Sequence, residues 1–302
     1  MNFKTFIISI LIIALSSCQK DIQIEVPDSR ETPLIIEGIL YAGQTPKIYI
    51  SHSQPFFSPE VTPQDVFARN LDVSISEGSS EYPLQPDSIF NKFRCRWELY
   101  YTGAFVPEQG KSYTLELSYN GKLITASTTI NQRKAEVLSV EYTPEFYDVY
   151  GGHDGVIINV EDHPEKGDYY RFQMDRWIDK SVLHAHVLDE YVNTCAEEGE
   201  LFPVTDIGRV IFSDENIESA IIEMMIEVTF EYSEGDSGYI YIQTLDEQSA
   251  EFYTNLDEQL QSILNPFVEP VFVETRIEGA MGIFGSAVIS DSIQFTYPQD
   301  HP

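Results

Sequence analysis

The chain has 302 residues and a formal net charge of -31, because 49 aspartates and glutamates outnumber 18 lysines and arginines. Such an acidic surface repels the phosphates of nucleic acids and of anionic lipid headgroups, so the composition argues against a DNA-binding, RNA-binding or polybasic membrane-docking protein. Hydrophobic residues make up 42% and aromatic residues 13% of the chain, which allows a normal core and favours β structure.

Residues 1–17 have the pattern of a targeting signal. Lys4 supplies a positive charge, and Phe6–Leu15 is an apolar run too short to span a bilayer comfortably. The run ends in Leu15-Ser16-Ser17-Cys18, which resembles a bacterial lipobox. The resemblance implies cleavage before Cys18, diacylglycerol on its thiol and acylation of the new amine, and several acyl chains anchor a protein stably. The alternative is an ordinary secretory signal with a chance cysteine.

Residues 18–32 are interpreted as a lipidated tether, because prolines and polar residues break any periodic pattern there. Gln19-Lys20-Asp21 directly follows the cysteine and resembles the surface-export signal of Bacteroidetes lipoproteins. This resemblance implies an outer-membrane protein that is lipid-anchored and faces the cell exterior. The alternative is a polar tether on the periplasmic face, which needs no such signal.

Residues 33–132 predict an N-terminal immunoglobulin-like β-sandwich, because short alternating segments recur between turns. Asn120-Gly121 is the strongest hairpin signal in the chain. The predicted strands are Leu34–Leu40, Lys47–Ser51, Leu71–Ser76, Arg94–Tyr101, Ser112–Tyr119 and Lys122–Ile130.

A second β-rich domain, residues 133–302, is expected beyond a polar boundary at residues 131–135. Ser249–Leu264 predicts one helix, with Ser249 as its cap and Pro266 beyond its end. Ala220–Tyr232 has helical spacing, but its β-branched residues favour a strand. The other predicted strands are Val137–Tyr142, Gly155–Val160, Tyr169–Trp177, Ser181–Leu188, Tyr239–Leu245, Phe272–Ile277 and Ala287–Phe295.

Two cysteines remain in the body, Cys95 and Cys195. An exported compartment permits a disulfide, and an even count fits one without requiring it. Their flanking residues carry no metal-ligand spacing, so a bridge and two free thiols stay equal alternatives.

Other side chains suggest metal binding. His184 and His186 lie on one face of a predicted strand and are weak candidates for a transition-metal site, the ordinary alternative being two surface histidines. The acidic segments Asp162–Glu165 and Asp214–Asn216 have calcium-binding side chains without EF-hand spacing. No catalytic motif is found, and we expect neither enzymatic activity nor a cofactor.

Two further features have a structural interpretation and a functional one. Trp97 and Trp177 could stack on sugars or peptides, but aromatic residues at strand positions belong more often to a core. Gly279, Gly282 and Gly285 permit turns or a close approach of two backbones. A phosphate-binding loop would need a following helix and usually a lysine, and neither is present in the sequence.

Several segments in order carry a family likeness. They are the Leu-Ile-Ile-Glu-Gly segment at 34–38, Gly110–Leu115 with Thr125–Thr128, Asn265–Pro270, and Arg276–Gly285. With the lipidated cysteine and the tether, this order resembles a family of Bacteroidetes lipoproteins catalogued as "domain of unknown function 4249". Members often carry a second glycine where Ala280 stands, a small change. Genes of such proteins often lie beside those of TonB-dependent outer-membrane transporters, so the resemblance implies an accessory role in uptake and supplies no catalytic residues.

These observations predict an outer-membrane or cell-surface lipoprotein that is a non-catalytic accessory or binding component of a TonB-dependent transporter in nutrient uptake. A surface hydrolase and a structural or adhesive envelope protein are the alternatives. The expected partners are the membrane, through the Cys18 lipid, and the transporter. Phe56 and Phe57 in the Pro55–Pro59 loop are a candidate contact for it, or fold back onto the sandwich.

Overall fold

The computed structural model describes residues 33–54, 61–148, 151–178, 195–197, 199–227, 235–264, 269 and 271–298. The helices and strands lie in one compact unit, Pro33–Pro302, and residues 1–32 are outside the described ranges. Strands dominate these ranges, which confirms the mainly β fold that the alternating pattern predicts. None of the helices in them is both long and apolar enough to cross a bilayer.

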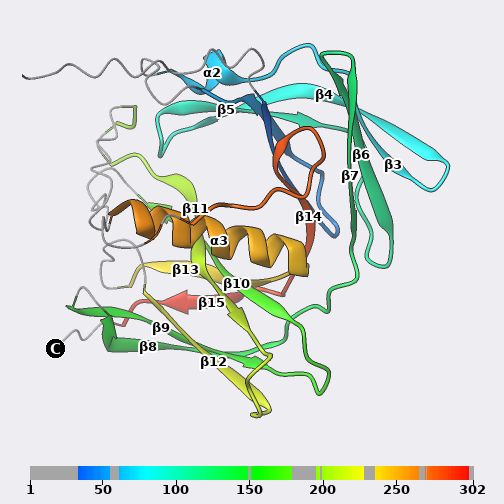
Figure 1. The fold of residues 1–302 in the computed structure, drawn as a ribbon. Coiled ribbons are helices and arrows are strands. Elements are labelled where there is room, and N and C mark those ends of the chain that lie inside the picture. Colours follow the sequence, from blue (N-terminus) through cyan, green and yellow to red (C-terminus); the bar gives the residue numbers. More distant parts are fainter. Residues whose placement is uncertain are drawn as a thin grey trace, which may run out of the picture. The chain divides into compact units, whose positions relative to one another are not determined.

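The first half of the unit is built of strands joined by short connections (Figure 1). Its elements are β1 (Leu34–Tyr41), β2 (Ile48–His52), α2 (Pro63–Val66), β3 (Val73–Glu77), β4 (Ser80–Asn91), β5 (Arg96–Thr102), β6 (Ser112–Tyr119) and β7 (Lys122–Thr129). The Asn120-Gly121 turn between β6 and β7 is confirmed, and both residues have positive φ angles, as a tight hairpin requires. Sequence reasoning missed β4, because Pro83 and Pro86 interrupt its pattern.

The second half adds more strands and the long helix. Its elements are β8 (Val137–Asp148), β9 (Gly151–Glu161), β10 (Tyr169–Ile178), β11 (Phe202–Ser213), β12 (Ile221–Glu227), β13 (Ser237–Leu245), α3 (Glu247–Leu264), β14 (Met281–Ile289) and β15 (Ile293–Thr296). In the part of the ambiguous segment that the structure describes, Ile221–Glu227 is a strand, β12. The predicted strand Phe272–Ile277 is wrong. That segment is a loop in which the Thr275 hydroxyl lies 3.1 Å and 3.2 Å from the carbonyl oxygens of Ala280 and Gly282.

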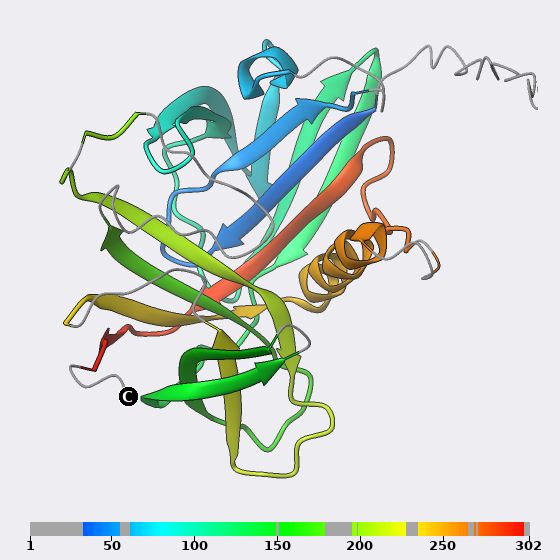
Figure 2. The ribbon, with the colours of Figure 1, turned by 90° about the vertical axis from the view of Figure 1, so that its left-hand side faces the viewer.

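One sheet runs through both halves in the order β11-β10-β13-β14-β1-β2-β5-β4-β3-β6-β7, with β15 beside β13. β1 and β14 lie side by side and pair in parallel (Figure 2). Their register sets Ile35 opposite Met281 and Tyr41 opposite Ala287. A strand from near the C-terminus therefore lies in the middle of the sheet. This ladder joins strands from the two predicted domains within one compact unit, and residues 131–135 connect β7 to β8 in it.

Three of the four apolar clusters among the described residues cover the two faces of the sheet. β3, β6 and β7 pack against β1, β2 and β14 in two layers, which is the sandwich expected for the N-terminal half with one strand added. A separate sheet, β12-β9-β8, packs against β10 and β13. α3 covers the opposite face of β1, β13 and β14 through Tyr253, Ile39 and Ala287.

The two strand glycines of β14 bring neighbouring elements close. Gly282 has a φ angle of +109°, and a Cβ there would overlap the carbonyl oxygen of Ile36 on β1. A Cβ on Gly285 would overlap the hydroxyl of Ser249 on α3. The glycines thus allow neighbouring elements to approach the backbone of β14 closely. This confirms the structural interpretation of the segment and places both glycines within a strand.

A buried polar cluster fixes the start of α3. The helix begins at Glu247 because Asp246, and not the predicted Ser249, is its N-cap: Asp246 Oδ1 accepts a hydrogen bond from the Ser249 backbone N–H at 2.8 Å. Asp246 Oδ2 also accepts a hydrogen bond from the backbone N–H of Ser286 on β14. The Ser286 hydroxyl in turn receives hydrogen bonds from Thr128 at 2.9 Å and from the Gln132 side chain at 3.2 Å. The helix, β14 and the end of β7 are therefore held at one point.

Candidate functional site

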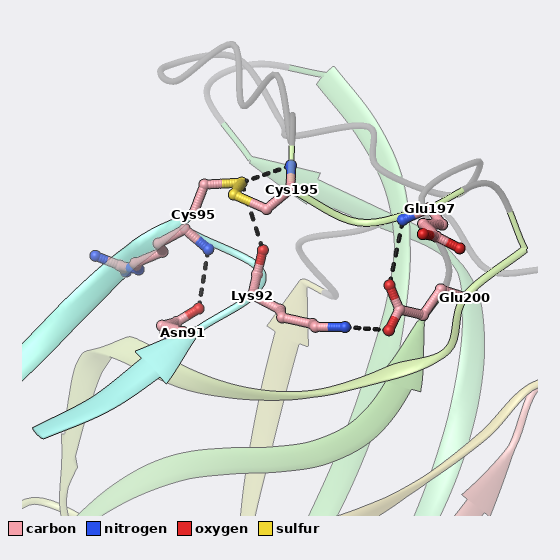
Figure 3. Close-up of a disulfide and its surroundings, with 7 residues drawn as sticks. Asn91, Lys92, Cys95, Cys195, Glu197 and Glu200 are labelled. Atoms are coloured by element: carbon pink, nitrogen blue, oxygen red, sulfur yellow. Dashed lines mark hydrogen bonds and ion pairs between the residues drawn. A yellow bond between two sulfur atoms is a disulfide. The ribbon is translucent and has the colours of Figure 1, made fainter.

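The structure joins Cys95 and Cys195 by a disulfide, which settles the alternative that the sequence left open (Figure 3). Their Cα atoms are 5.6 Å apart, and 100 positions separate them in the sequence. Cys95 lies in the turn between β4 and β5, and Cys195 lies in the connection between β10 and β11. Since β4-β5 and β10-β11 are far apart in the strand order, the bond joins distant parts of the sheet.

Noncovalent contacts surround this bond. Phe93, in the same turn as Cys95, packs in a buried apolar cluster with Ile178, Ala196, Phe202 and Val204 from the β10–β11 side. Lys92 forms an ion pair with Glu200, and this hydrogen-bonded ammonium lowers the pKa of the Glu200 carboxyl (Figure 3). We call the disulfide, the ion pair and the Phe93 cluster together the clasp.

A buried ion pair lies between the adjacent strands β10 and β11. The Arg176 guanidinium is 2.8 Å from Asp206 Oδ2, and the two side chains are only 2% and 13% exposed. Burial raises the pKa of the Asp206 carboxyl from 3.8 to about 6, and the Arg176 charge opposes only part of this effect. The carboxyl is therefore poised to change its protonation state in mildly acidic solution.

This raised pKa predicts a pH dependence of stability. The folded chain binds the Asp206 proton more readily than the unfolded chain, so the stability from this group is fully present below pH 3.8 and is lost as the pH rises through about 6. The pKa difference corresponds to about 3 kcal/mol. Urea unfolding of the unaltered chain and of Asp206→Asn between pH 3.5 and pH 7 should show the unaltered chain gaining relative stability as the pH falls. A difference that stays constant with pH would contradict this assignment.

The two acidic segments that the sequence singles out meet at one pocket. It has a volume of about 610 Å³ and lies between the β9–β10 and β11–β12 connections. Its polar lining comprises Asp162, His163, Lys166, Glu215, Asn216, Glu218 and Ser219. The two connections are far apart in the sequence, so only the folded arrangement of the strands brings them together at this pocket.

Buried hydrogen bonds hold the pocket's walls. Asp214 is fully buried, and its Oδ1 accepts hydrogen bonds from the backbone N–H groups of Gly167 and Asp168 at 2.8 Å and 3.0 Å. Arg133 donates to Asp168 Oδ2 through Nε at 3.2 Å and through its terminal nitrogen at 2.9 Å, and it also pairs with Glu165 at 3.1 Å. The walls are therefore fixed by contacts that come from three separate segments.

The pocket's groups can hydrogen-bond a small polar molecule. Its buried carboxylate, Asp162, is already paired with the Lys166 ammonium at 2.5 Å. In the part of the chain that the structure describes, no group of three or more His, Cys, Asp or Glu side chains is arranged to hold a metal ion. The calcium hypothesis for these two acidic segments thus gains no support from their geometry.

Several sequence candidates lie outside the described residues. They are the lipidation site Cys18, the export residues Gln19, Lys20 and Asp21, the two histidines His184 and His186, and the phenylalanines Phe56 and Phe57.

Of the two interpretations of the tryptophans, the commoner one, a core position, does not hold for either. Trp97, on β5, is 45% exposed, and Trp177, on β10, is 65% exposed. Trp97 follows the charged run Lys92–Arg96, which was a signal in the sequence against a buried position.

Comparison with known proteins adds one finding. A family model described as "Domain of unknown function (DUF4249)" matches residues 19–292, which is most of the chain. A search of curated proteins finds no match.

Proposed function

Since this chain belongs to the family of domain of unknown function 4249, we propose that it is an exported lipoprotein, anchored through Cys18, that acts as a non-catalytic binding component beside a TonB-dependent outer-membrane transporter. The single observation that carries its exported location is the Cys95–Cys195 disulfide. Disulfides form and persist in oxidising compartments outside the cytoplasm and are rare within it. The lipobox-like segment, residues 15–18, independently indicates export from the cytoplasm.

The proposed anchor explains how an acidic body stays at a membrane. Acyl chains on Cys18 bind the bilayer by burial of apolar groups, which does not depend on the charge of the protein. The tether, residues 18–32, spans up to about 50 Å when extended, so the body can reach partners beside the anchor. Confinement to the plane of the membrane raises the effective concentration of such a partner, and a modest interface then suffices for binding. The choice of a transporter as the partner is supported by the family resemblance.

The anchor is tested by a Cys18→Ala variant. We expect this variant to lose incorporation of a fatty-acid probe and to leave the membrane fraction, because no other thiol follows a lipobox-like segment. Probe incorporation and membrane fractionation in the native host measure both effects.

A Cys195→Ala variant is the matched control and should keep its label, since Cys195 lies in the folded body. Undiminished labelling of Cys18→Ala would contradict the proposal. The same strains test the partner, because a transporter should co-purify with the tagged lipidated chain from detergent-solubilised outer membrane. Repeated recovery of abundant bait without any transporter would exclude the uptake role.

A further inference from the structure

The turn between β4 and β5 has an unusual charge for this chain. Lys92, Arg94 and Arg96 lie within five residues, although the whole chain has 18 lysines and arginines and a net charge of -31. Residues 88–97 contain no carboxylate. We call residues 88–97 the hairpin tip. It is a local cationic exception on an acidic protein.

Two of these cations are available to a partner. Arg94 and Arg96 are exposed, and neither side chain forms an ion pair with another residue that the structure describes. The Lys92 ammonium, by contrast, is held by Glu200 within the clasp. The flanking Glu98 carboxylate accepts a hydrogen bond from the Asn91 side chain at 2.6 Å. Neither Glu200 nor Glu98 therefore forms an ion pair with Arg94 or Arg96, and both arginine charges face the solvent.

Exposed apolar side chains lie beside the arginines. Phe90 and Trp97 are paired across the β4–β5 ladder, with ring centroids 5.4 Å apart in an edge-to-face arrangement. They are 38% and 45% exposed. Ile89, which precedes Phe90 and therefore points to the other face of the hairpin, is 48% exposed. Large apolar groups are thus exposed on both faces of the hairpin.

The clasp holds this exposed tip in one position. Phe93 is buried in the cluster with Ile178 and Phe202, and Cys95 is bonded to Cys195. The clasp therefore holds the backbone of the tip at two of its residues, Phe93 and Cys95. A preorganised surface of this kind loses little conformational entropy when it binds.

We propose that the hairpin tip docks on the surface of an anionic lipid bilayer. Arg94 and Arg96 bind lipid phosphates, and Trp97 and Phe90 enter the interfacial layer, where amphipathic aromatic rings are favoured. A fluid lipid surface contacts both faces of a hairpin, whereas a flat protein surface contacts one, so the apolar exposure on both faces favours lipid. Acidic groups more than about 8 Å from the tip act weakly here, because charges at that distance are screened at physiological salt. This inference rests on the proposed anchor, which brings the body to a membrane.

The two tryptophans of the chain provide the test. The full lipidated chain is reconstituted in vesicles of brominated phosphatidylcholine, with and without phosphatidylglycerol. A Trp177→Phe variant leaves Trp97 as its only tryptophan, and Trp97→Phe leaves Trp177 as the matched control. We expect bromine to quench Trp97 emission in the vesicles that contain phosphatidylglycerol, and to quench it more strongly than the emission of Trp177, which lies outside the hairpin tip.

Charge reversal at the tip supplies the decisive comparison. With Trp177→Phe in place, replacing Arg94 and Arg96 by Glu should lower the docking equilibrium constant by at least about five-fold for each arginine. Vesicle flotation separates the two hypotheses. Flotation without Trp97 quenching, or quenching that the charge reversal does not change, would overturn lipid docking and leave the anchor intact. A chain that fails to float would refute the anchor and the docking together.

Discussion

A Gly282→Ala chain is expected to lose at least about 3 kcal/mol of unfolding free energy, because the substitution combines overpacking with backbone strain. The added Cβ would overlap the carbonyl oxygen of Ile36, which belongs to the backbone of β1 and cannot move aside as a side chain can. The φ angle of +109° at Gly282 is also one that an alanine rarely adopts. Urea denaturation followed by tryptophan fluorescence measures the loss, and poor accumulation of folded protein would be its extreme form.

Gly110→Ala is the matched control for this prediction. Gly110 has a similar positive φ angle of +84°, but an added Cβ there meets no atom within 4 Å. Its replacement should therefore cost only the backbone strain, about 1 kcal/mol. Equal losses at the two positions would show that the contact between β14 and β1 does not restrict residue 282.

The second large effect is expected from removing the disulfide. Replacing Cys95 and Cys195 by Ser should lower the unfolding free energy by about 4 kcal/mol, because the bond closes a loop of 100 residues in the unfolded chain. Equilibrium unfolding of the oxidised chain and of the double variant measures this difference. The Phe93 cluster and the Lys92–Glu200 pair remain in the variant, so we expect the folded state to keep its overall β content.

Two comparisons check that the loss comes from the covalent bond. The single Cys95→Ser variant should be destabilised as much as the double variant, and a reductant should bring the unaltered chain to the same value. A loss below about 1 kcal/mol would indicate that noncovalent contacts already hold the unfolded chain together across this loop.

Local sequence patterns were enough to predict the elements whose conformation depends mainly on their own residues. Asn120-Gly121 marked the β6–β7 hairpin because both residues adopt positive φ angles easily. Helical spacing of the apolar residues Phe252 and Leu256 is typical of an amphipathic helix, and in α3 both side chains pack against the core beside the sheet. The family of the chain was likewise carried by the order of short segments along the sequence.

Tertiary structure alone decided which distant segments meet. Phe272–Ile277 has a strand pattern but finds no partner strand, whereas the glycine-containing segment Met281–Ile289 pairs in parallel with β1. Cys95 and Cys195, and the two acidic segments of the pocket, come together only because the sheet brings their connections close. An alternating pattern indicates which side of a strand is apolar, but it does not indicate which other strand pairs with it. Pairing between distant segments depends on the whole chain, and in this protein it forms both the pocket and the clasp.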